Sequence, residues 1–445
     1  MQLKWMPLAV FALLAKSAGA AGVTFKVVYN FGGPGNLTAT PTSIVEVSPG
    51  KFMGTGSNGA ELFSITSDGV YNNIYVFPQI PSGLTAWGLT PALNNQVYGG
   101  AVALGTSPTF SELYSLSKAG AFTAYPYNPA TQGGTFNPVQ DPDNHLYSLF
   151  GIEGGPVTFA RLDYQGDPTT LHTFTAAEGA PYSLFLGAAA DFYGISFLGN
   201  YSSAGIFRLT TEGVFSWVVP SFSKVGNQYP VALIEADNGK FYGTLTYGGT
   251  AGAGAIFEAN LSGQMRAIYE FPQRNTGIPA TLMEASDGLL YGTAIGEDTD
   301  LQNNAVSSIF RLDPSSGSFE TLYQFAGRDC ECRLVQGSDG RIFGISYYQS
   351  AAGTFFVLDA GLPPPQPLIR TIAPASGPVG QLVLFWGRNL LGATAVSFNG
   401  TPALTFNVPT SQGIWAEVPA GATSGPITVT TPHGTYVTSQ SFTVE

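Results

Sequence analysis

The side chains best suited to chemistry are few and scattered in this 445-residue sequence. It has three histidines, His145, His172 and His433, and no two of them have the spacing of a metal-binding or metalloprotease motif. No Gly-x-Ser-x-Gly nucleophile turn and no phosphate-binding glycine loop occurs either. We therefore expect the histidines to have structural roles. We predict no metal site and no cofactor, and we assign no catalytic residue.

The two cysteines, Cys330 and Cys332, lie in the segment RDCECRL. They are too few for a disulfide framework or for a four-ligand zinc site. A local disulfide between them or two idle thiols on a loop is the expectation, and half of a metal site is the alternative.

Acidic side chains offer two further kinds of chemistry. The segment GTAIGEDTDLQNN contains Glu297, Asp298 and Asp300, whose oxygens are of the type that binds Ca²⁺. Their spacing is not that of an EF-hand loop, which favours a solvated acidic loop. Carboxylates for glycoside cleavage would have to converge from separate parts of the chain, and a sequence does not show such convergence.

Aromatic and amide side chains offer another chemistry, the binding of neutral glycans. Trp87, Tyr201 and Tyr247 are able to stack on sugar rings, while Asn200 and Arg274 are able to hydrogen-bond to hydroxyl groups. The alternative is that these aromatic residues pack only within their own loops. The strands between the loops decide whether the five residues share one surface.

Three strand patterns recur in a fixed order and would position these loops. An aromatic-glycine strand occurs seven times at intervals of 45 to 52 residues, as KFMGT, QVYGG, HLYSL, DFYGI, KFYGT, LLYGT and RIFGI. An alternating strand such as GIFRLT follows each one, and an aromatic-x-aromatic strand such as IYEF also appears seven times. With the apolar strand that precedes each turn, as in ALIEA, every unit has four strands.

A four-stranded unit of about 48 residues has the size of a propeller blade. The sequence therefore predicts an all-β, seven-bladed β-propeller over residues 22–361. The strand VVYNF at 27–31 has no preceding unit and the seventh unit lacks its fourth strand, so the N-terminal strand should complete the last blade and close the ring. Eight blades or an open solenoid are the alternatives.

Pairs such as Asn238-Gly239 and Asp287-Gly288 are predicted to form hairpin turns, in which Asx and Gly supply positive φ angles. The glycine after each aromatic residue should let neighbouring blades approach closely, while Tyr or Phe fills the wedge between them. On the same topology, the crossings between blades and the loops between second and third strands share one rim. Trp87, Tyr247 and the other three glycan-binding candidates would lie there.

The units with GIFRL, LYxF and SDGxLYGT resemble the GloVer-type tandem repeat of bacterial extracellular proteins, those described with a choice of C-terminal anchors. The resemblance covers residues 23–362 and is strongest over 206–312. It implies secretion or surface display by a bacterium, with no established activity.

A proline-rich linker at 362–367, LPPPQP, is followed by a segment of different character. Short alternating strands over 368–445 predict a β-sandwich. Its motifs, among them Ser376-Gly377-Pro378, Asn399-Gly400 and Gly425-Pro426, resemble those of an IPT/TIG domain, an immunoglobulin-like fold. The resemblance implies a spacer or contact module, and no active site is carried over.

Composition sets the remaining limits. A net charge of −12 and the absence of basic runs argue against nucleic acid as a partner. Residues 1–20 have an early lysine, an apolar stretch and small residues suited to cleavage, which indicates a signal peptide. Because that stretch is about ten residues long, it is short of the ~20 that a spanning helix needs, and no membrane-spanning segment is expected after cleavage.

The leading hypothesis is a secreted or cell-surface binding or scaffold protein without catalytic activity. One loop-rich face of its propeller would bind a glycan or a cell-envelope protein, and its Ig-like domain would act as a spacer. The alternative is an extracellular glycosidase or lyase acting on polysaccharide, with carboxylates in the propeller channel. A purely structural surface protein is a third possibility.

Overall fold

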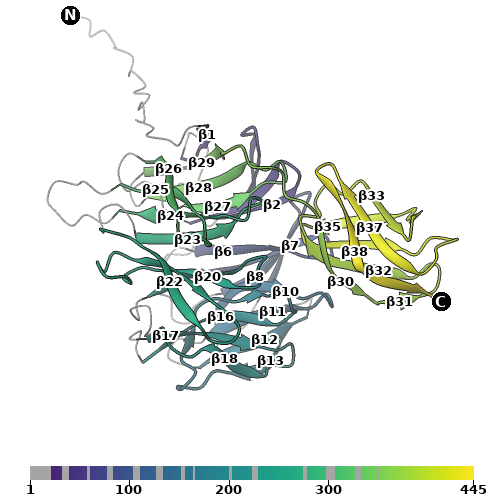
Figure 1. The fold of residues 1–445 in the computed structure, drawn as a ribbon, viewed down its shortest axis with the longest axis horizontal. Helices are drawn as coiled ribbons and strands as arrows, with labels where there is room; N and C mark the ends of the chain where they lie inside the picture. The colour runs from purple at the N-terminus through teal and green to yellow at the C-terminus, as the bar shows by residue number, and fades with distance from the viewer. Residues whose placement is uncertain are drawn as a thin grey trace, which may run out of the picture.

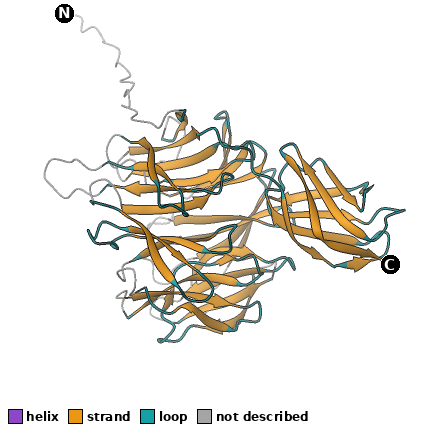
Figure 2. Cartoon of the chain, viewed as in Figure 1, coloured by secondary structure: helices purple, strands orange, loops and turns teal. Residues whose placement is uncertain are grey.

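The computed structural model describes residues 22–32, 40–57, 61–77, 84–103, 111–126, 134–151, 156–163, 166–199, 203–222, 229–273, 278–296, 306–325, 332–348 and 351–445. Strands and loops make up this described part, in which no helix occurs (Figure 2). The expected all-β class is confirmed. No helix in the described ranges is long and apolar enough to cross a membrane.

Seven antiparallel sheets follow one another along the described chain up to Asp359, and we number them sheets 1 to 7. Sheet 1 contains β2 (Thr40–Ser48), β3 (Lys51–Ser57), β4 (Glu61–Thr66) and β5 (Tyr71–Val76). Sheet 2 contains β6 (Leu84–Pro91), β7 (Gln96–Ala103), β8 (Ser111–Ser117) and β9 (Phe122–Pro126). Sheet 3 contains β10 (Gly134–Gln140), β11 (Leu146–Gly151), β12 (Val157–Leu162) and β13 (Pro168–Thr173).

The next three sheets repeat this order. Sheet 4 contains the short β14 (Ala180–Pro181) and β15 (Phe185–Leu186), then β16 (Phe192–Leu198), β17 (Ser203–Leu209) and β18 (Phe215–Val219). Sheet 5 contains β19 (Pro230–Glu235), β20 (Phe241–Leu245), β21 (Ala255–Ala259) and β22 (Met265–Glu270). Sheet 6 contains β23 (Ile278–Glu284), β24 (Leu290–Ile295), β25 (Ser308–Leu312) and β26 (Phe319–Gln324).

Sheet 7 joins the two ends of the repeat region. It contains β27 (Arg333–Gln336), β28 (Ile342–Tyr348) and β29 (Ala351–Asp359), and its fourth strand is β1 (Thr24–Asn30). Thr24 lies opposite Asp359 in the register of β1 and β29. The expected pairing of the N-terminal strand with the last unit is confirmed.

Sheets 7 and 1 also share a hydrophobic core, so the last sheet packs against the first. Phe52 and Phe63 of sheet 1 are fully buried against Phe343 and Phe355 of sheet 7. The rings of Phe52 and Phe343 have centroids 4.7 Å apart.

The repeated turn and the aromatic residue after it form one hydrogen-bonded unit. Asn238 Nδ2 donates to the hydroxyl of Tyr242 at 2.9 Å, and the Tyr291 hydroxyl donates to Asp287 Oδ2 at 2.9 Å. Gly239 has φ 72° and therefore occupies the left-handed region that glycine tolerates. The Asn or Asp residue thus shapes the turn and also forms a hydrogen bond with the hydroxyl of the buried tyrosine.

The glycine of each aromatic-glycine strand accommodates a ring from the next strand of the same sheet. Gly54 is the register partner of Phe63, and a Cβ atom at Gly54 would collide with the Phe63 ring. Gly344 and Phe356 of sheet 7 have the same relation. The sequence predicts that this glycine lets neighbouring blades approach closely, and that prediction is wrong. The atoms nearest to the glycine belong to its cross-strand partner in the same sheet.

Residues 368–445, the C-terminal unit, form two sheets around a separate core. One contains β30 (Leu368–Ala373), β32 (Leu382–Arg388), β36 (Gly413–Glu417) and β35 (Phe406–Thr410). The other contains β31 (Ser376–Gly377), β38 (Gly434–Val444), β37 (Gly425–Thr431), β33 (Ala395–Phe398) and β34 (Thr401–Pro402). Alternate side chains from both sheets, such as Phe385 and Val429, are fully buried between them.

The C-terminal unit lies against one side of the seven sheets (Figure 1). This is the side of the turns between first and second strands, which we call the turn face. Leu93 of the first turn in sheet 2 packs against Leu384 and Trp386 of β32. Lys118, in a neighbouring turn of sheet 2, donates to the carbonyl oxygen of Val408 at 3.2 Å. The opposite side, where the second strands end, is the loop face.

Candidate functional site

The structure describes only part of the predicted glycan-binding rim. Asn200, Tyr201 and Arg274 lie outside the described residues, and so does the side chain of Trp87, whose backbone belongs to β6. Tyr247 follows β20 at the loop face and is half-buried. The proposal that these five residues share one binding surface stays a prediction.

Three other aromatic residues come together at the loop face, and we call Tyr182, Phe197 and Tyr229 the loop-face cluster. The ring centroids of Tyr182 and Phe197 are 5.6 Å apart, and those of Phe197 and Tyr229 are 4.9 Å apart. Tyr182 is 54% exposed and Tyr229 is 44% exposed. The amide of Thr246 donates to the carbonyl oxygen of Tyr229 at 3.0 Å, which ties this cluster to the segment that contains Tyr247.

Sequence reasoning missed these tyrosines because it searched only the loops. Each stands beside a proline at the start of a first strand, in APY at 180–182 and QYP at 228–230. Tyr229 has φ 35°, a value that is uncommon for a bulky residue. An aromatic residue next to a proline at the first strand of a sheet is the signal that would have found them.

On the turn face, carboxylate and amide side chains hold neighbouring sheets together. Glu235 at the end of β19 accepts a hydrogen bond from the Ala188 amide of sheet 4 at 2.6 Å. Glu284 at the end of β23 accepts one from the Asp237 amide of sheet 5 at 2.8 Å. The equivalent pairs elsewhere are Glu46 with Ser338, Gln140 with Leu93 and Gln336 with Ser286.

Two of these carboxyl groups have perturbed acidities. Burial raises the pKa of Glu284 to about 7, against the lowering effect of the Arg370 charge. Burial also raises the pKa of Glu46, although the amides of Gly50 and Ser338 donate to its carboxylate and lower it. Each of the two carboxylates accepts a backbone amide from a neighbouring sheet. This structural role explains why Glu46 and Glu284 are placed there.

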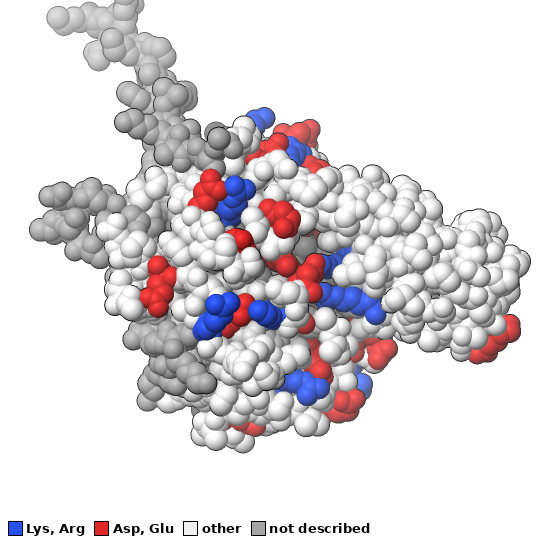
Figure 3. All heavy atoms as spheres, in the orientation of Figure 1, with Lys and Arg blue, Asp and Glu red and all other residues white. Residues whose placement is uncertain are grey.

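An ion-pair cluster joins the C-terminal unit to the turn face. Arg388 of β32 contacts the carboxylate of Asp237, and its Nη1 lies 3.9 Å from Oε2 of Glu284. Arg370 of β30 lies 3.8 Å from the other oxygen of Asp237. Basic and acidic groups meet at this junction in Figure 3, whereas the visible surface of the C-terminal unit carries few charges.

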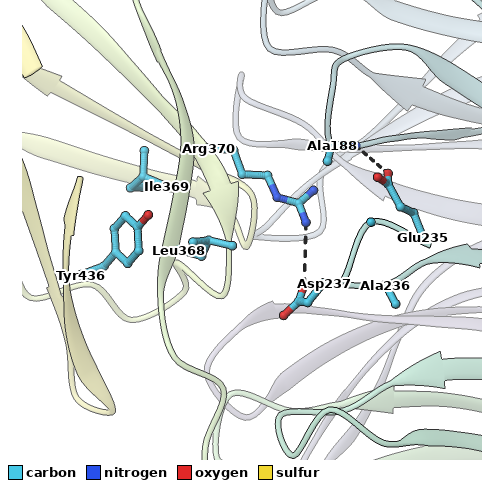
Figure 4. Close-up of a pocket in the computed structure, with 9 residues that line it drawn as sticks. Ala188, Glu235, Ala236, Asp237, Leu368, Ile369, Arg370 and Tyr436 are labelled. Atoms are coloured by element: carbon cyan, nitrogen blue, oxygen red, sulfur yellow. Dashed lines mark hydrogen bonds and ion pairs between the residues drawn. The ribbon is translucent and has the colours of Figure 1, made fainter. Parts of the chain in front are cut away.

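A cavity of about 440 Å³ lies beside this cluster, between sheets 4 and 5 and the C-terminal unit, and we call it the interdomain cleft. Glu235, Asp237 and the backbone near Ala188 line it on one side, while Arg370 and Tyr436 line it on the other (Figure 4). A smaller cavity of about 120 Å³ lies between Glu46, Ser338 and the turn that contains His433.

The histidines have separate structural surroundings. The ring of His145 lies 3.4 Å from Oδ2 of Asp141. His172 in β13 lies 3.2 Å from Glu178 and stacks on Phe215. Within the part of the chain that the structure describes, no group of three or more His, Cys, Asp or Glu side chains could hold a metal ion.

Cys332 is fully buried and disulfide-bonded. Cys330, the other cysteine of the sequence, lies outside the described residues, as do Glu297, Asp298 and Asp300. The pairing of Cys332 with Cys330 stays a prediction.

Comparison with known families and sequences identifies the repeat. Residues 94–299 match the model of the Gloeobacter/Verrucomicrobia repeat family, which confirms the expected type of repeat for that part of the chain. No curated protein sequence matches this chain.

Solved structures of similar fold are β-propeller proteins. Virginiamycin B lyase from Staphylococcus aureus has a TM-score of 0.54 at 16% identity over 76% of this chain and 99% of its own. An oligogalacturonate lyase in complex with manganese has a TM-score of 0.50 at 12% identity, covering 78% of this chain and 98% of its own. The extracellular domain of a protein described as a hybrid two-component system from B. thetaiotaomicron has a TM-score of 0.51 at 10% identity. The match covers 95% of this chain and 57% of that one. Identities this low show the fold alone.

Proposed function

We propose that this chain is a secreted or cell-surface binding and scaffold protein. Its seven sheets are the blades of a β-propeller, residues 362–367 are a linker, and residues 368–445 are an immunoglobulin-like domain of IPT/TIG type. The loop face binds a glycan, and the C-terminal domain on the turn face serves as a spacer or docking unit. The observation that carries this proposal is the exposed loop-face cluster.

The chemistry of the loop-face cluster suits a sugar ring. A tyrosine ring packs against the C–H face of a pyranose, and its hydroxyl remains available to hydrogen-bond with the sugar or with water. Tyr182 and Tyr229 expose roughly half of their surface and flank the less exposed Phe197. Only 10% of the residues in the sequence are charged, which favours an uncharged partner over a polyanion.

An extracellular location is part of the proposal. The match of residues 94–299 to a repeat family and the fold shared with an extracellular domain support it. The disulfide at Cys332 supports it independently, because disulfides persist mainly in oxidising compartments. The signal peptide expected at residues 1–20 would provide the route.

The test is a binding assay with residues 21–445 on insoluble cellulose, xylan, chitin and mannan, in which retained protein and newly released reducing ends are both recorded. The expected result is retention without release, and its loss in Tyr182→Ala and Tyr229→Ala. Leu261→Ala is the matched control, since Leu261 is an exposed apolar residue, 58% accessible, on a turn of sheet 5. Retention that survives both tyrosine substitutions contradicts the assignment to the loop face.

An enzyme that cleaves polysaccharide is the second candidate, favoured by one observation. Glu284 has a pKa of about 7, which suits a general acid or base near neutral pH. Release of sugar ends that disappears in Glu284→Gln would support this candidate. The carboxylate is held by the Asp237 amide and lies beside Arg388, so a role in docking explains its surroundings better.

A further inference from the structure

We propose that the interdomain cleft is a second binding site, which takes the end of a neutral oligosaccharide. It lies on the turn face, away from the loop-face cluster, and is formed jointly by the seven sheets and the C-terminal unit. The proposal does not depend on the function assigned to the loop face.

The size and composition of the cleft suit one or two sugar rings. Its volume of about 440 Å³ is within the range of small-ligand sites, which is roughly 300–1,000 Å³. Leu368 and the half-buried Tyr436 give it an apolar wall on the C-terminal unit. Such a wall fits the C–H face of a pyranose.

The lining of the cleft carries charges of both signs, Glu235 and Asp237 against Arg370, which disfavours a strongly charged ligand. Asp237 is contacted by Arg388 and lies 3.8 Å from Arg370. A ligand whose hydroxyl groups both donate and accept hydrogen bonds satisfies carboxylates and guanidinium groups together. An anionic or a cationic ligand would meet at least one charge of its own sign among Glu235, Asp237 and Arg370.

Two polar atoms at the cleft are available to such a ligand. Glu235 uses Oε2 to accept the Ala188 amide, while its Oε1 accepts no hydrogen bond from any residue that the structure describes. The Tyr436 hydroxyl likewise has no hydrogen-bond partner within the described ranges. In Figure 4, Arg370 extends from the C-terminal unit toward Asp237, while Tyr436 lies beside Ile369 on the same unit.

The experiment is calorimetric titration of residues 21–445 with cellotetraose, xylotetraose and mannotetraose, and with trigalacturonate as the anionic probe. It is carried out in a background with both Tyr182→Ala and Tyr229→Ala, which removes the two exposed rings of the loop-face cluster. Binding of at least one neutral tetrasaccharide is expected. Arg370→Gln, Glu235→Gln and Tyr436→Ala should each weaken it by about tenfold, as expected for the loss of one hydrogen-bonded or stacking contact.

Glu235→Gln keeps the shape of the side chain and removes its charge and one acceptor oxygen, so it carries the test if Tyr436→Ala or Arg370→Gln fails to fold. Small-angle scattering of each variant shows whether the C-terminal unit remains docked. The proposal is wrong if no neutral tetrasaccharide binds, if only trigalacturonate binds, or if docked cleft variants bind as well as the unsubstituted protein. Because loop-face binding is assayed on polysaccharide with Tyr182 intact, the two proposals fail separately.

Discussion

Glu235 reaches across the boundary between two sheets and accepts the backbone amide of Ala188 at 2.6 Å. The two residues are 47 positions apart, and the same separation relates Asp237 to Glu284 and Leu93 to Gln140. In these three pairs the partners are one repeat length apart. The side chain at the end of a first strand accepts a backbone amide from the turn of the preceding sheet. The contact lies on the turn face, beside the C-terminal unit.

Replacing this acceptor should loosen the boundary between sheets 4 and 5. Glu235→Ala leaves the Ala188 amide without its partner, and because Glu235 is only half-buried we expect a loss of about 1–2 kcal/mol in the free energy of unfolding. Glu235→Gln should lose much less, because Gln140 and Gln336 occupy the equivalent position in sheets 3 and 7. Urea unfolding of the three proteins measures both effects. Equal losses in the two variants would contradict the hydrogen-bond explanation.

The glycine of the aromatic-glycine strand should be intolerant of a single methyl group. Gly54→Ala forces Cβ into the ring of Phe63, and overpacking of this kind costs about 1–3 kcal/mol. Adding Phe63→Leu removes the ring atoms that collide, so the double variant should be less destabilised than the sum of the two single variants. Thermal unfolding of all four proteins gives this coupling energy. Strict additivity would show that Gly54 and Phe63 do not constrain each other.

The sequence predicts the strands well because each unit repeats the same local chemistry. The turn at Asn238-Gly239 and the alternation in GIFRLT are visible in the letters, and the unmatched strand at 27–31 predicts the pairing of β1 with β29. The role of the glycine was wrongly assigned, because only the register of Gly54 against Phe63 shows that its neighbour is in the same sheet.

The candidate sites are less predictable for physical reasons. The loop-face cluster brings Phe197 between two tyrosines from different sheets, and the cleft needs Arg370 to meet Asp237 across two units. Both depend on how separately folded pieces are placed, which no local pattern encodes. The glutamates of SIVEV, ALIEA and TLMEA were visible in the repeat, but their partners were not. Glu235 and Glu284 accept amides from one unit earlier, and Glu46 accepts the Ser338 amide from the last unit.

Removal of the first strand should open the sheet that closes the repeat region. Deletion through Phe31 exposes the edge of β29 and removes a ring that is only 1% exposed and packs 5.2 Å from the ring of Phe63. We expect a lower Tm and self-association that increases with concentration, because an uncovered edge strand pairs with other chains. Size-exclusion chromatography with light scattering detects the self-association, and thermal unfolding measures the change in Tm. A chain that starts at residue 22 is the control and should remain unaffected.

The stability of the protein should fall as the pH rises toward neutrality, owing to Glu284. Burial raises its pKa from the ordinary value of 4.5 to about 7, so the folded protein binds this proton more tightly than the unfolded chain. The contribution is complete below pH 4.5 and is lost as the pH rises to about 7, and it amounts to up to about 3 kcal/mol.

Glu284→Gln removes this titration and keeps an oxygen for the Asp237 amide. The difference in unfolding free energy between the two proteins should therefore change between pH 4.5 and 7.5, with the variant gaining relative stability at the higher pH. Urea unfolding across this range checks it. Parallel profiles for the two proteins would contradict the assignment to Glu284.

The pairing of β1 with β29 also determines the order in which the molecule is completed. Six sheets are assembled from strands that are neighbours in the chain, so they form as soon as their own segments are available. The seventh joins Thr24 to Asp359 and must wait for the end of the repeat region. Because contacts between distant segments form slowly, a newly made chain carries its first strand unpaired until the last repeat has been synthesised.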